Sequence, residues 1–267
     1  MENSVLLSES EAGEYWNRNA NVWTKLAREG YDVYRDHVNT PGFFRFLPDV
    51  SGKTGLDIGC GEGYNTRILA SKAKAVDAID ISPMFIGFAK EQELAEPLGI
   101  RYAVASATQL PFPDQHFDFI VSQMCMMDLP EPDKALAEAF RVLKPGGFFQ
   151  FSITHPCFNT PHRRNLRNER GITYAIEVGN YFQKQNGKIE EWIFRRAENE
   201  NLPLRKFQVP VFNRTLSEWV EIITSADFIL EALHEPGIDD ETLEKYPALQ
   251  DSQIVAYFLH FRCRRPA

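Results

Sequence analysis

LDIGCGEGYN, residues 56–65, ends a short apolar segment with an acid and then places glycine at every second position. Glycine tolerates positive φ and lets the backbone pass close to a ligand. The apolar residues before the glycines predict a strand, and the residues after them predict a helix. In an open α/β sheet, ligands bind beyond the carboxyl ends of the strands. We therefore expect a ligand-binding loop at 57–63.

Strand-like and helix-like segments alternate around this loop. Expected strands cover 54–60, 75–81, 101–107, 117–124 and 148–154, and expected helices cover 63–72, 82–95 and 131–143. Such alternation predicts right-handed crossovers and a parallel sheet with helices on both faces, a doubly wound Rossmann-like α/β fold.

The flanking segments predict a single domain with additions. Helices are expected over 8–30, where Ser8 and Glu11 have capping-box spacing, and over 32–47. The rhythm breaks at 156–213, where Asn186-Gly187 predicts a hairpin turn. A helix over 214–227 and strands over 228–235 and 253–263 follow. We interpret 1–50 as a helical cap, 54–155 as the cofactor-binding core, 156–213 as a lid and 214–267 as the rest of the sheet.

Composition and charge narrow the partners. The chain has 267 residues, 43% of them hydrophobic, which is enough for a large core. A net charge of −8 disfavours nucleic acid, which usually needs a basic surface. The 4 cysteines form no CxxC pair and match no zinc spacing, so no metal is expected. No secretory signal or membrane-spanning apolar run is present, and we expect a cytoplasmic protein that is not bound to a membrane.

The glycine spacing and the acid before it point to one ligand class. A dinucleotide fingerprint reads GxGxxG, whereas this loop reads GxGxG, and Asp57 lies two residues before the first glycine. A carboxylate there would repel a pyrophosphate but suits an ammonium or a sulfonium. S-adenosylmethionine carries both and has no phosphate. Asp80 ends the second strand, where it can accept hydrogen bonds from two ribose hydroxyls; the alternative is that it only caps the next helix with Ser82.

Four segments together carry a family resemblance. LDIGCGEGYNTRILA, AIDISPMFI, ATQLPFPDQHFDFIVSQ and AFRVLKPGGFFQFS occur in that order between 54 and 155. They resemble the successive motifs of class I S-adenosylmethionine-dependent methyltransferases of the small-molecule type. The resemblance implies a seven-stranded, mostly parallel sheet with a reversed final strand. The expected cofactor-binding residues are Asp57, Gly59, Cys60, Gly61, Asp80, Ile81, Ser106, Ala107 and Gln123.

The chain departs from the family pattern at one position. Many relatives have Asp-Ala where this chain has Ser106-Ala107. That aspartate accepts a hydrogen bond from the adenine amino group. A serine hydroxyl is an uncharged and weaker acceptor. We therefore expect a weaker adenine contact at this point.

The acceptor side is less determined. His155, at the end of the fifth strand, is the candidate base, with His234 and Glu235 as a second choice; a structural histidine is the alternative. Candidate substrate residues are Trp23, Tyr31, Arg35 and Arg214, all of which could instead serve packing or charge balance. Aromatic residues in both the cap and the lid suggest a partly aromatic acceptor.

The expected function is methyl transfer from S-adenosylmethionine to a small organic molecule, at oxygen or nitrogen rather than carbon. The Asn/Asp-Pro-Pro-aromatic motif of base-flipping amino methyltransferases is absent after the fourth strand. Two alternatives remain: a protein that binds the cofactor without catalysis, and a nicotinamide-dependent oxidoreductase. The glycine spacing, Asp57 and the lack of a Tyr-x-x-x-Lys pair disfavour the oxidoreductase.

Overall fold

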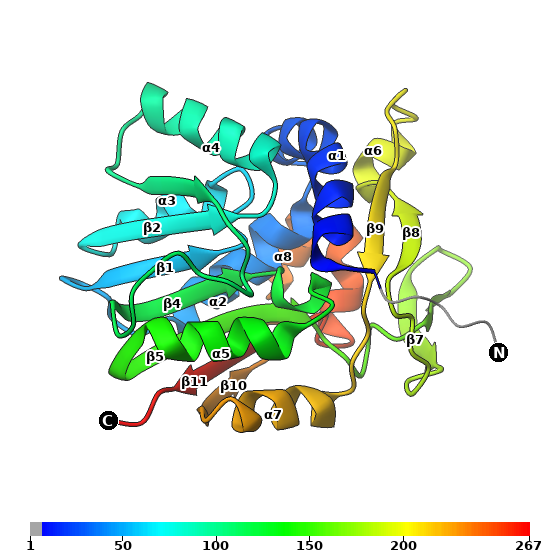
Figure 1. The fold of residues 1–267 in the computed structure, drawn as a ribbon. Helices are drawn as coiled ribbons and strands as arrows, with labels where there is room; N and C mark the ends of the chain where they lie inside the picture. The colour runs from blue at the N-terminus through cyan, green and yellow to red at the C-terminus, as the bar shows by residue number, and fades with distance from the viewer. Residues whose placement is uncertain (1–6) are drawn as a thin grey trace.

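The central sheet has the seven strands that the resemblance implies. A computed structural model describes residues 7–267 (Figure 1). Its seven-stranded sheet has the order β10-β11-β5-β4-β1-β2-β3. The strands are β1 (Thr54–Ile58), β2 (Ala75–Asp80), β3 (Arg101–Val104), β4 (Phe117–Gln123), β5 (Leu143–Thr154), β10 (Ile229–His234) and β11 (Phe258–Arg264). Pairs among β1 to β5 are parallel, and β11 is antiparallel to both β5 and β10, which confirms the reversed final strand.

Helices cover both faces of the sheet, as alternation predicts (Figure 1). The crossover helices are α3 (Tyr64–Ala70), α4 (Pro83–Ala95), α5 (Pro132–Val142) and α7 (Leu216–Ser225). Successive residues of β4 serve opposite faces: Phe119 packs with Phe43 and Leu69, whereas Ile120 packs in the cluster that contains Trp219. Because the central strands are buried on both faces, their sequences are mostly apolar and do not alternate between apolar and polar residues.

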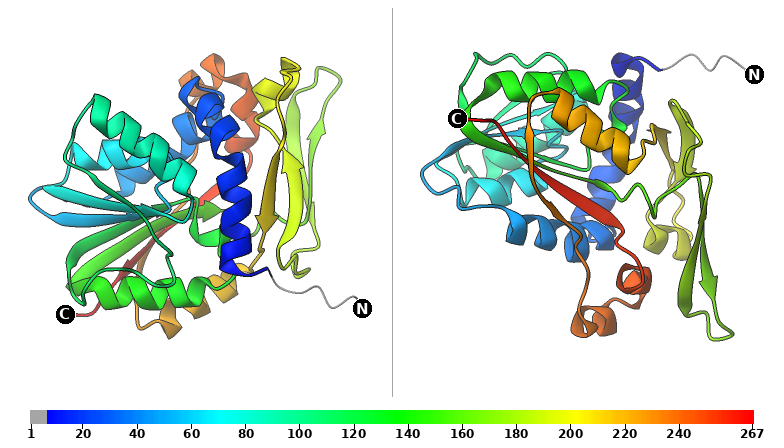
Figure 2. Two further views of the ribbon diagram at one scale, coloured as in Figure 1. Left: turned by 45° about the horizontal axis from the view of Figure 1, so that its top comes forward. Right: turned by 90° about the horizontal axis from the view of Figure 1, so that it is seen from below.

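The N-terminal cap braces two parts of the molecule. It consists of α1 (Glu9–Arg28), the π-helical turn η1 (Arg35–Asn39) and α2 (Thr40–Phe46), and the Ser8–Glu11 capping box is confirmed. Asn17 Oδ1 accepts from Ser82 Oγ and from the Met84 N–H at the start of α4. Asn19 exchanges two hydrogen bonds with the backbone of Gln208. Helix α1 therefore lies between the core and the insertion (Figure 2).

The insertion forms two small antiparallel sheets outside the main one. Strands β6 (His162–Arg167) and β7 (Thr173–Gly179) form one pair; β8 (Lys188–Trp192) and β9 (Phe207–Val211) form the other, with α6 (Arg195–Asn199) between them. The hairpin predicted at Asn186-Gly187 is wrong. Both residues adopt positive φ, 46° and 89°, but the turn only leads into β8, whose partner is β9 further along the chain. Local turn chemistry was right, and strand pairing was decided by contacts distant in sequence.

Some boundaries differ from prediction. The strand expected from residue 253 begins at Phe258, because η3 (Pro247–Gln253) precedes it, after α8 (Asp240–Lys245). Strand β5 begins at Leu143 and takes in Lys144–Gly147, which the sequence suggested as a loop. No helix within residues 7–267 is long and apolar enough to cross a membrane.

Candidate active site

A cavity of about 680 Å³ opens at the carboxyl ends of the parallel strands. This volume lies within the range of about 300–1,000 Å³ that is usual for ligand sites. The loops after β1, β2 and β4 form its floor, and α1, β8 and β9 form the opposite wall, with residues such as Trp16, Glu190 and Val209. The cap and the insertion therefore contribute directly to the site.

The glycine loop forms one wall of the cavity through its backbone. Gly59 and Gly61 have φ of 71° and 55°, in the region that side-chain-bearing residues rarely adopt. A Cβ on Gly59 would lie 2.3 Å from the Cys125 sulfur, so that glycine is required by packing. A Cβ on Gly61 would meet no atom within 4 Å. Because Gly61 lines the cavity, that open space is available to a ligand.

Asp80 holds the end of β2 against the glycine loop. Its Oδ2 accepts the Gly61 N–H and its Oδ1 accepts the Ser82 N–H, both at 2.9 Å. Burial raises the pKa of Asp80, while the two N–H donors lower it. Each carboxylate oxygen retains a further lone pair, and Asp80 lines the cavity. The position predicted for contact with a diol is therefore both oriented and accessible.

Asp57 is a buried carboxylate beneath the same loop. Thr66 Oγ1, on α3, donates to its Oδ2 at 2.6 Å. Burial raises the pKa of Asp57 to about 7, although the Thr66 hydrogen bond opposes this and the nearby Asp80 adds to it. A buried acid of this kind favours a positively charged partner.

Other polar groups at the floor test whether the predicted cofactor fits. Gln123 lines the cavity, and its Oε1 is buried with no hydrogen-bond partner among the described residues. Cys60, Ile81 and Ala107 also line it. An unused buried acceptor, two acids and an open glycine cradle suit a ligand with hydroxyl and cationic groups. The residues present therefore fit S-adenosylmethionine.

Ser106 is not at the cavity surface. Its hydroxyl lies 2.7 and 2.8 Å from the two carboxylate oxygens of Glu9, at the start of α1. Thr108 Oγ1 donates to the same carboxylate at 2.6 Å. Glu9, unlike Ser106, lines the cavity. The cap thus brings the Glu9 carboxylate next to the position where this chain lacks the family's aspartate. The sequence around 106–107 gives no indication of this contact.

His155 cannot serve as the predicted base in this arrangement. It lies outside the cavity lining and is 3% exposed. Its Nδ1 accepts the Cys157 N–H at 3.2 Å, so Nε2 carries the proton and donates to Glu235 Oε1 at 2.7 Å. Both ring nitrogens are therefore occupied by the β5 end and by Glu235, which follows β10. His234, the second choice, faces His260, at 3.2 Å between their Nδ1 atoms, and also lies outside the lining.

The candidate substrate residues separate into two groups. Trp23, Arg35 and Arg214 line the cavity, and Tyr31 does not, because its hydroxyl donates to Glu200 at 2.6 Å. Trp23 packs edge-on against Trp16, with ring centroids 5.5 Å apart. It therefore combines a packing role with a place in the wall.

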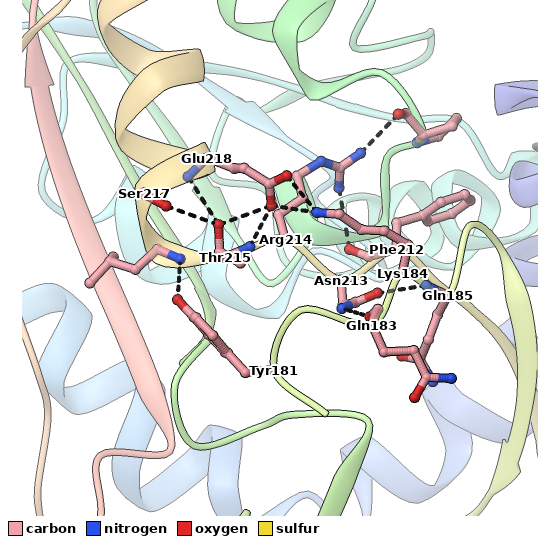
Figure 3. Close-up of polar contacts among 12 residues, drawn as sticks. Tyr181, Gln183, Lys184, Gln185, Phe212, Asn213, Arg214, Thr215, Ser217 and Glu218 are labelled. Atoms are coloured by element: carbon pink, nitrogen blue, oxygen red, sulfur yellow. Dashed lines mark hydrogen bonds and ion pairs between the residues drawn. The ribbon is translucent and has the colours of Figure 1, made fainter. Parts of the chain in front are cut away.

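The two arginines have most of their donors committed to the protein. Arg35 donates to Asp36, Glu62 and the Ala27 carbonyl. Arg214 donates to the carbonyls of Phe212, Leu129 and Pro130, and Figure 3 shows it at the start of α7 beside Thr215 and Glu218. Burial lowers the pKa of Arg214 to about 10. Arg35 thus lines the cavity with its guanidinium already paired inside the protein, and Arg214 mainly holds the loop after β4.

Sequence reasoning missed five carboxylates in the lining, those of Glu9, Asp32, Glu62, Asp128 and Glu190. Asp128 follows β4 in the apolar segment MCMMDLP. A single acid in an apolar segment is the sequence feature that could have indicated a site residue here. Asp32 and Glu190 lie in the cap and the insertion, whose positions over the sheet follow only from tertiary packing. Within residues 7–267, no group of three or more His, Cys, Asp or Glu side chains is arranged to hold a metal ion.

The sheet order, the glycine loop and the paired acids are those of a class I S-adenosylmethionine-dependent methyltransferase domain. Residues 56–151 match the methyltransferase domain family. The chain is 38% identical over 125 residues to the ubiquinone/menaquinone biosynthesis C-methyltransferase UbiE of Vibrio vulnificus, covering 43% of this chain and 48% of that protein. It is 31% identical over 159 residues to the fatty-acid O-methyltransferase of Mycolicibacterium smegmatis, covering 56% and 57%.

Solved structures extend the likeness to most of the chain at the level of fold. An S-adenosylmethionine-dependent methyltransferase from Mesorhizobium loti superposes with a TM-score of 0.66 at 22% identity, covering 84% of this chain and 96% of that one. A methyltransferase from Aquifex aeolicus superposes with a TM-score of 0.57 at 15% identity, covering 91% of this chain and 97% of that one. The chain spans about half the length of the curated relatives it matches.

Proposed function

We propose that this protein transfers the methyl group of S-adenosylmethionine to a small, partly aromatic organic molecule, at nitrogen or oxygen. The observation that carries the proposal is one continuous cavity that joins the glycine loop and Asp80 to an aromatic wall built by the cap and the insertion. The cofactor end and the acceptor end thus lie in a single space. The net charge of −8 supports a small molecule rather than a nucleic acid as acceptor.

The chain's own residues would hold the cofactor by its charges and hydroxyls. Asp80 would accept from the ribose hydroxyls, Asp57 would favour the positive charge, and Gly59 and Gly61 would let the backbone approach the methionine portion. When bound, the cofactor supplies an electrophilic methyl group on a sulfonium. Its leaving group is already good, so the protein mainly has to align the acceptor and exclude water.

The wall opposite the glycine loop supports an acceptor with an aromatic or apolar body. Trp16, Trp23, Trp192 and Phe194 line it and pack edge-on against one another, Trp23 to Trp192 at 5.6 Å and Trp23 to Phe194 at 5.0 Å. Pre-packed rings lose little freedom when a ligand binds, so they favour a flat apolar partner. The two curated relatives named above are a C-methyltransferase and an O-methyltransferase. The acceptor proposed for this chain is therefore inferred from the residues of its own cavity wall.

Binding and turnover experiments test the proposal at separate steps. Isothermal titration should show binding of S-adenosylhomocysteine, with NADH as the control for the oxidoreductase alternative. Labelled S-adenosylmethionine with aromatic and aliphatic acceptors should then give a labelled product. Binding without turnover of any acceptor would favour the non-catalytic alternative. Failure to bind either S-adenosylmethionine or S-adenosylhomocysteine at millimolar concentration would refute the proposal.

A further inference from the structure

Asp128 stands out among the carboxylates of the cavity because it has no donor. It ends the short 3-10 helix η2 (Met126–Asp128), directly after β4. Within residues 7–267, no N–H or O–H group donates to its side chain and no cation forms an ion pair with it. Asp57, by contrast, accepts from Thr66, and Asp80 accepts two backbone N–H groups. Asp128 is only partly buried and lines the cavity, so its carboxylate is open to a donor that a ligand brings.

Arg214, the charged neighbour of Asp128, forms no ion pair with it. Arg214 acts on Asp128 only at longer range, because its guanidinium donates to three backbone carbonyls. Burial raises the pKa of Asp128 well above its usual value, and Arg214 lowers it only in part. Asp128 is therefore able to accept and hold a proton.

The rest of the acceptor end adds negative charge and aromatic surface. Asp32 and Glu190 line the same cavity, from the cap and from β8. Burial raises the pKa of Asp32 to about 6. Neither lysine nor histidine lines the cavity among the described residues. Of its three arginines, Arg35 is occupied by Asp36 and Glu62 and Arg214 by backbone carbonyls, while Arg195 is exposed at the start of α6. Carboxylates therefore outnumber available cations, and aromatic faces attract cations further.

We propose that the acceptor is an amine that enters as its ammonium ion, and that Asp128 binds this group and takes its proton. This inference rests on the proposed methyl transfer and narrows it from nitrogen or oxygen to nitrogen. An acceptor that carries a carboxylate at its reacting end would meet three carboxylates, those of Asp128, Asp32 and Glu190. Arg195 is the one arginine of the lining whose side chain forms no hydrogen bond or ion pair within residues 7–267. This balance of charge disfavours the fatty-acid type of acceptor named for one of the relatives.

The proton and electron balance is complete with the groups already named. The ammonium group gives one proton to the carboxylate of Asp128 and becomes a neutral amine. Its lone pair then forms the new nitrogen–carbon bond while the methyl–sulfur bond breaks, and the electron pair of that bond stays on sulfur. The positive charge passes from the sulfonium to the methylated amine, and the donor leaves as the thioether S-adenosylhomocysteine.

Matched ligands of different charge test the inference. The protein saturated with S-adenosylhomocysteine is titrated at pH 7.5 with benzylamine, phenethylamine and tryptamine. The alcohols and carboxylates of the same skeletons are titrated in parallel. We expect at least one amine to bind about tenfold or more tightly than its alcohol and its carboxylate, and the same amine to accept labelled methyl from S-adenosylmethionine.

Two variants locate the effect. Asp128→Asn is nearly isosteric and should abolish the preference for the amine, so that the amine and its alcohol bind with affinities within about twofold of each other. Asp133→Asn removes an exposed acid in the first turn of α5, outside the cavity lining, and should retain the preference. Binding of S-adenosylhomocysteine by Asp128→Asn would show that the variant is folded. If the variant does not fold, the preference of the wild type for amines still tests the proposed class of acceptor.

Each outcome has a separate meaning. Equal or tighter binding of alcohols or carboxylates, an unchanged preference in Asp128→Asn, or no amine binding at millimolar concentration would overturn the role of Asp128. In each of these cases, binding of S-adenosylhomocysteine by the wild type leaves the proposed methyl transfer standing. Loss of S-adenosylhomocysteine binding in the wild type overturns both.

Discussion

Replacing Gly61 with alanine separates ligand contact from backbone strain. Gly61 has φ of 55°, and a Cβ there would meet no protein atom within 4 Å. The added methyl group therefore costs the fold only the strain of a left-handed L-residue, about 1–2 kcal/mol. For a chain of this size, that lowers Tm by about 2–4 °C per kcal/mol.

The effect on the cofactor should be larger than this strain. The methyl group would occupy space at the edge of the cavity that a bound ligand needs. Overpacking of this kind costs about 1–3 kcal/mol. At 1.4 kcal/mol per factor of ten, the affinity for S-adenosylhomocysteine should fall about 5- to 140-fold.

A second glycine offers a matched control. Gly52 also has positive φ, 73°, and a Cβ there would likewise meet nothing within 4 Å, but it lies in the turn before β1 and outside the cavity lining. Gly52→Ala should lower Tm by a similar amount and leave affinity unchanged. Thermal unfolding and isothermal titration measure both effects. If Gly61→Ala binds S-adenosylhomocysteine within twofold of the wild type, the glycine loop does not contact the cofactor.

Three further predictions follow from the same site. Asp80→Asn should weaken S-adenosylhomocysteine binding about tenfold or more, because a charge-assisted hydrogen bond contributes about 1.5–3 kcal/mol. Asp77→Asn, which changes an acid on the same strand that is paired with Arg101, should leave the affinity unchanged. Equal affinities of the two variants in titration would contradict this prediction. Burial raises the pKa of Asp57 to about 7. Because the proton must leave before this carboxylate pairs with a cation, S-adenosylmethionine affinity should rise with pH up to about 7, at most about tenfold per unit. The rise should be shallower in Asp57→Asn, and identical pH profiles would refute the assignment. His155→Gln should lower Tm by several degrees, since a buried hydrogen bond costs about 1–3 kcal/mol when broken, yet leave kcat/KM within about threefold; a loss of a hundredfold would restore His155 as a catalytic base.

The cofactor half of the site could be predicted from sequence because its determinants are local. Asp57, Gly59 and Gly61 belong to one strand–loop unit, and Asp80 ends the neighbouring strand. The carboxyl ends of adjacent parallel strands meet at one edge of the sheet, so strand order is enough to bring these residues together. Of the predicted cofactor residues, all but Ser106 line the cavity.

The acceptor half was not predictable in the same way. His155 has the right position in sequence, but the direction of its ring is set by Glu235, 80 positions away along the chain. Asn186-Gly187 adopts the turn conformation its residues favour, yet the partner of β8 lies beyond α6. Each of these outcomes depends on long-range packing, which leaves no mark in a short window of sequence.

The sequence by itself determined the doubly wound sheet, the glycine loop and the acids beneath it, because alternating apolar segments and backbone-permissive glycines act over a few residues. The reversed final strand followed from the family resemblance. Only the tertiary structure decided that α1 carries Glu9 to the place beside Ser106 and that Arg35 and Arg214 are occupied by the protein. It also decided that Asp128 faces the cavity with no donor from the part of the chain that the structure describes. The physical reason is that a side chain's charge becomes available to a ligand only after the fold has settled which other groups satisfy it.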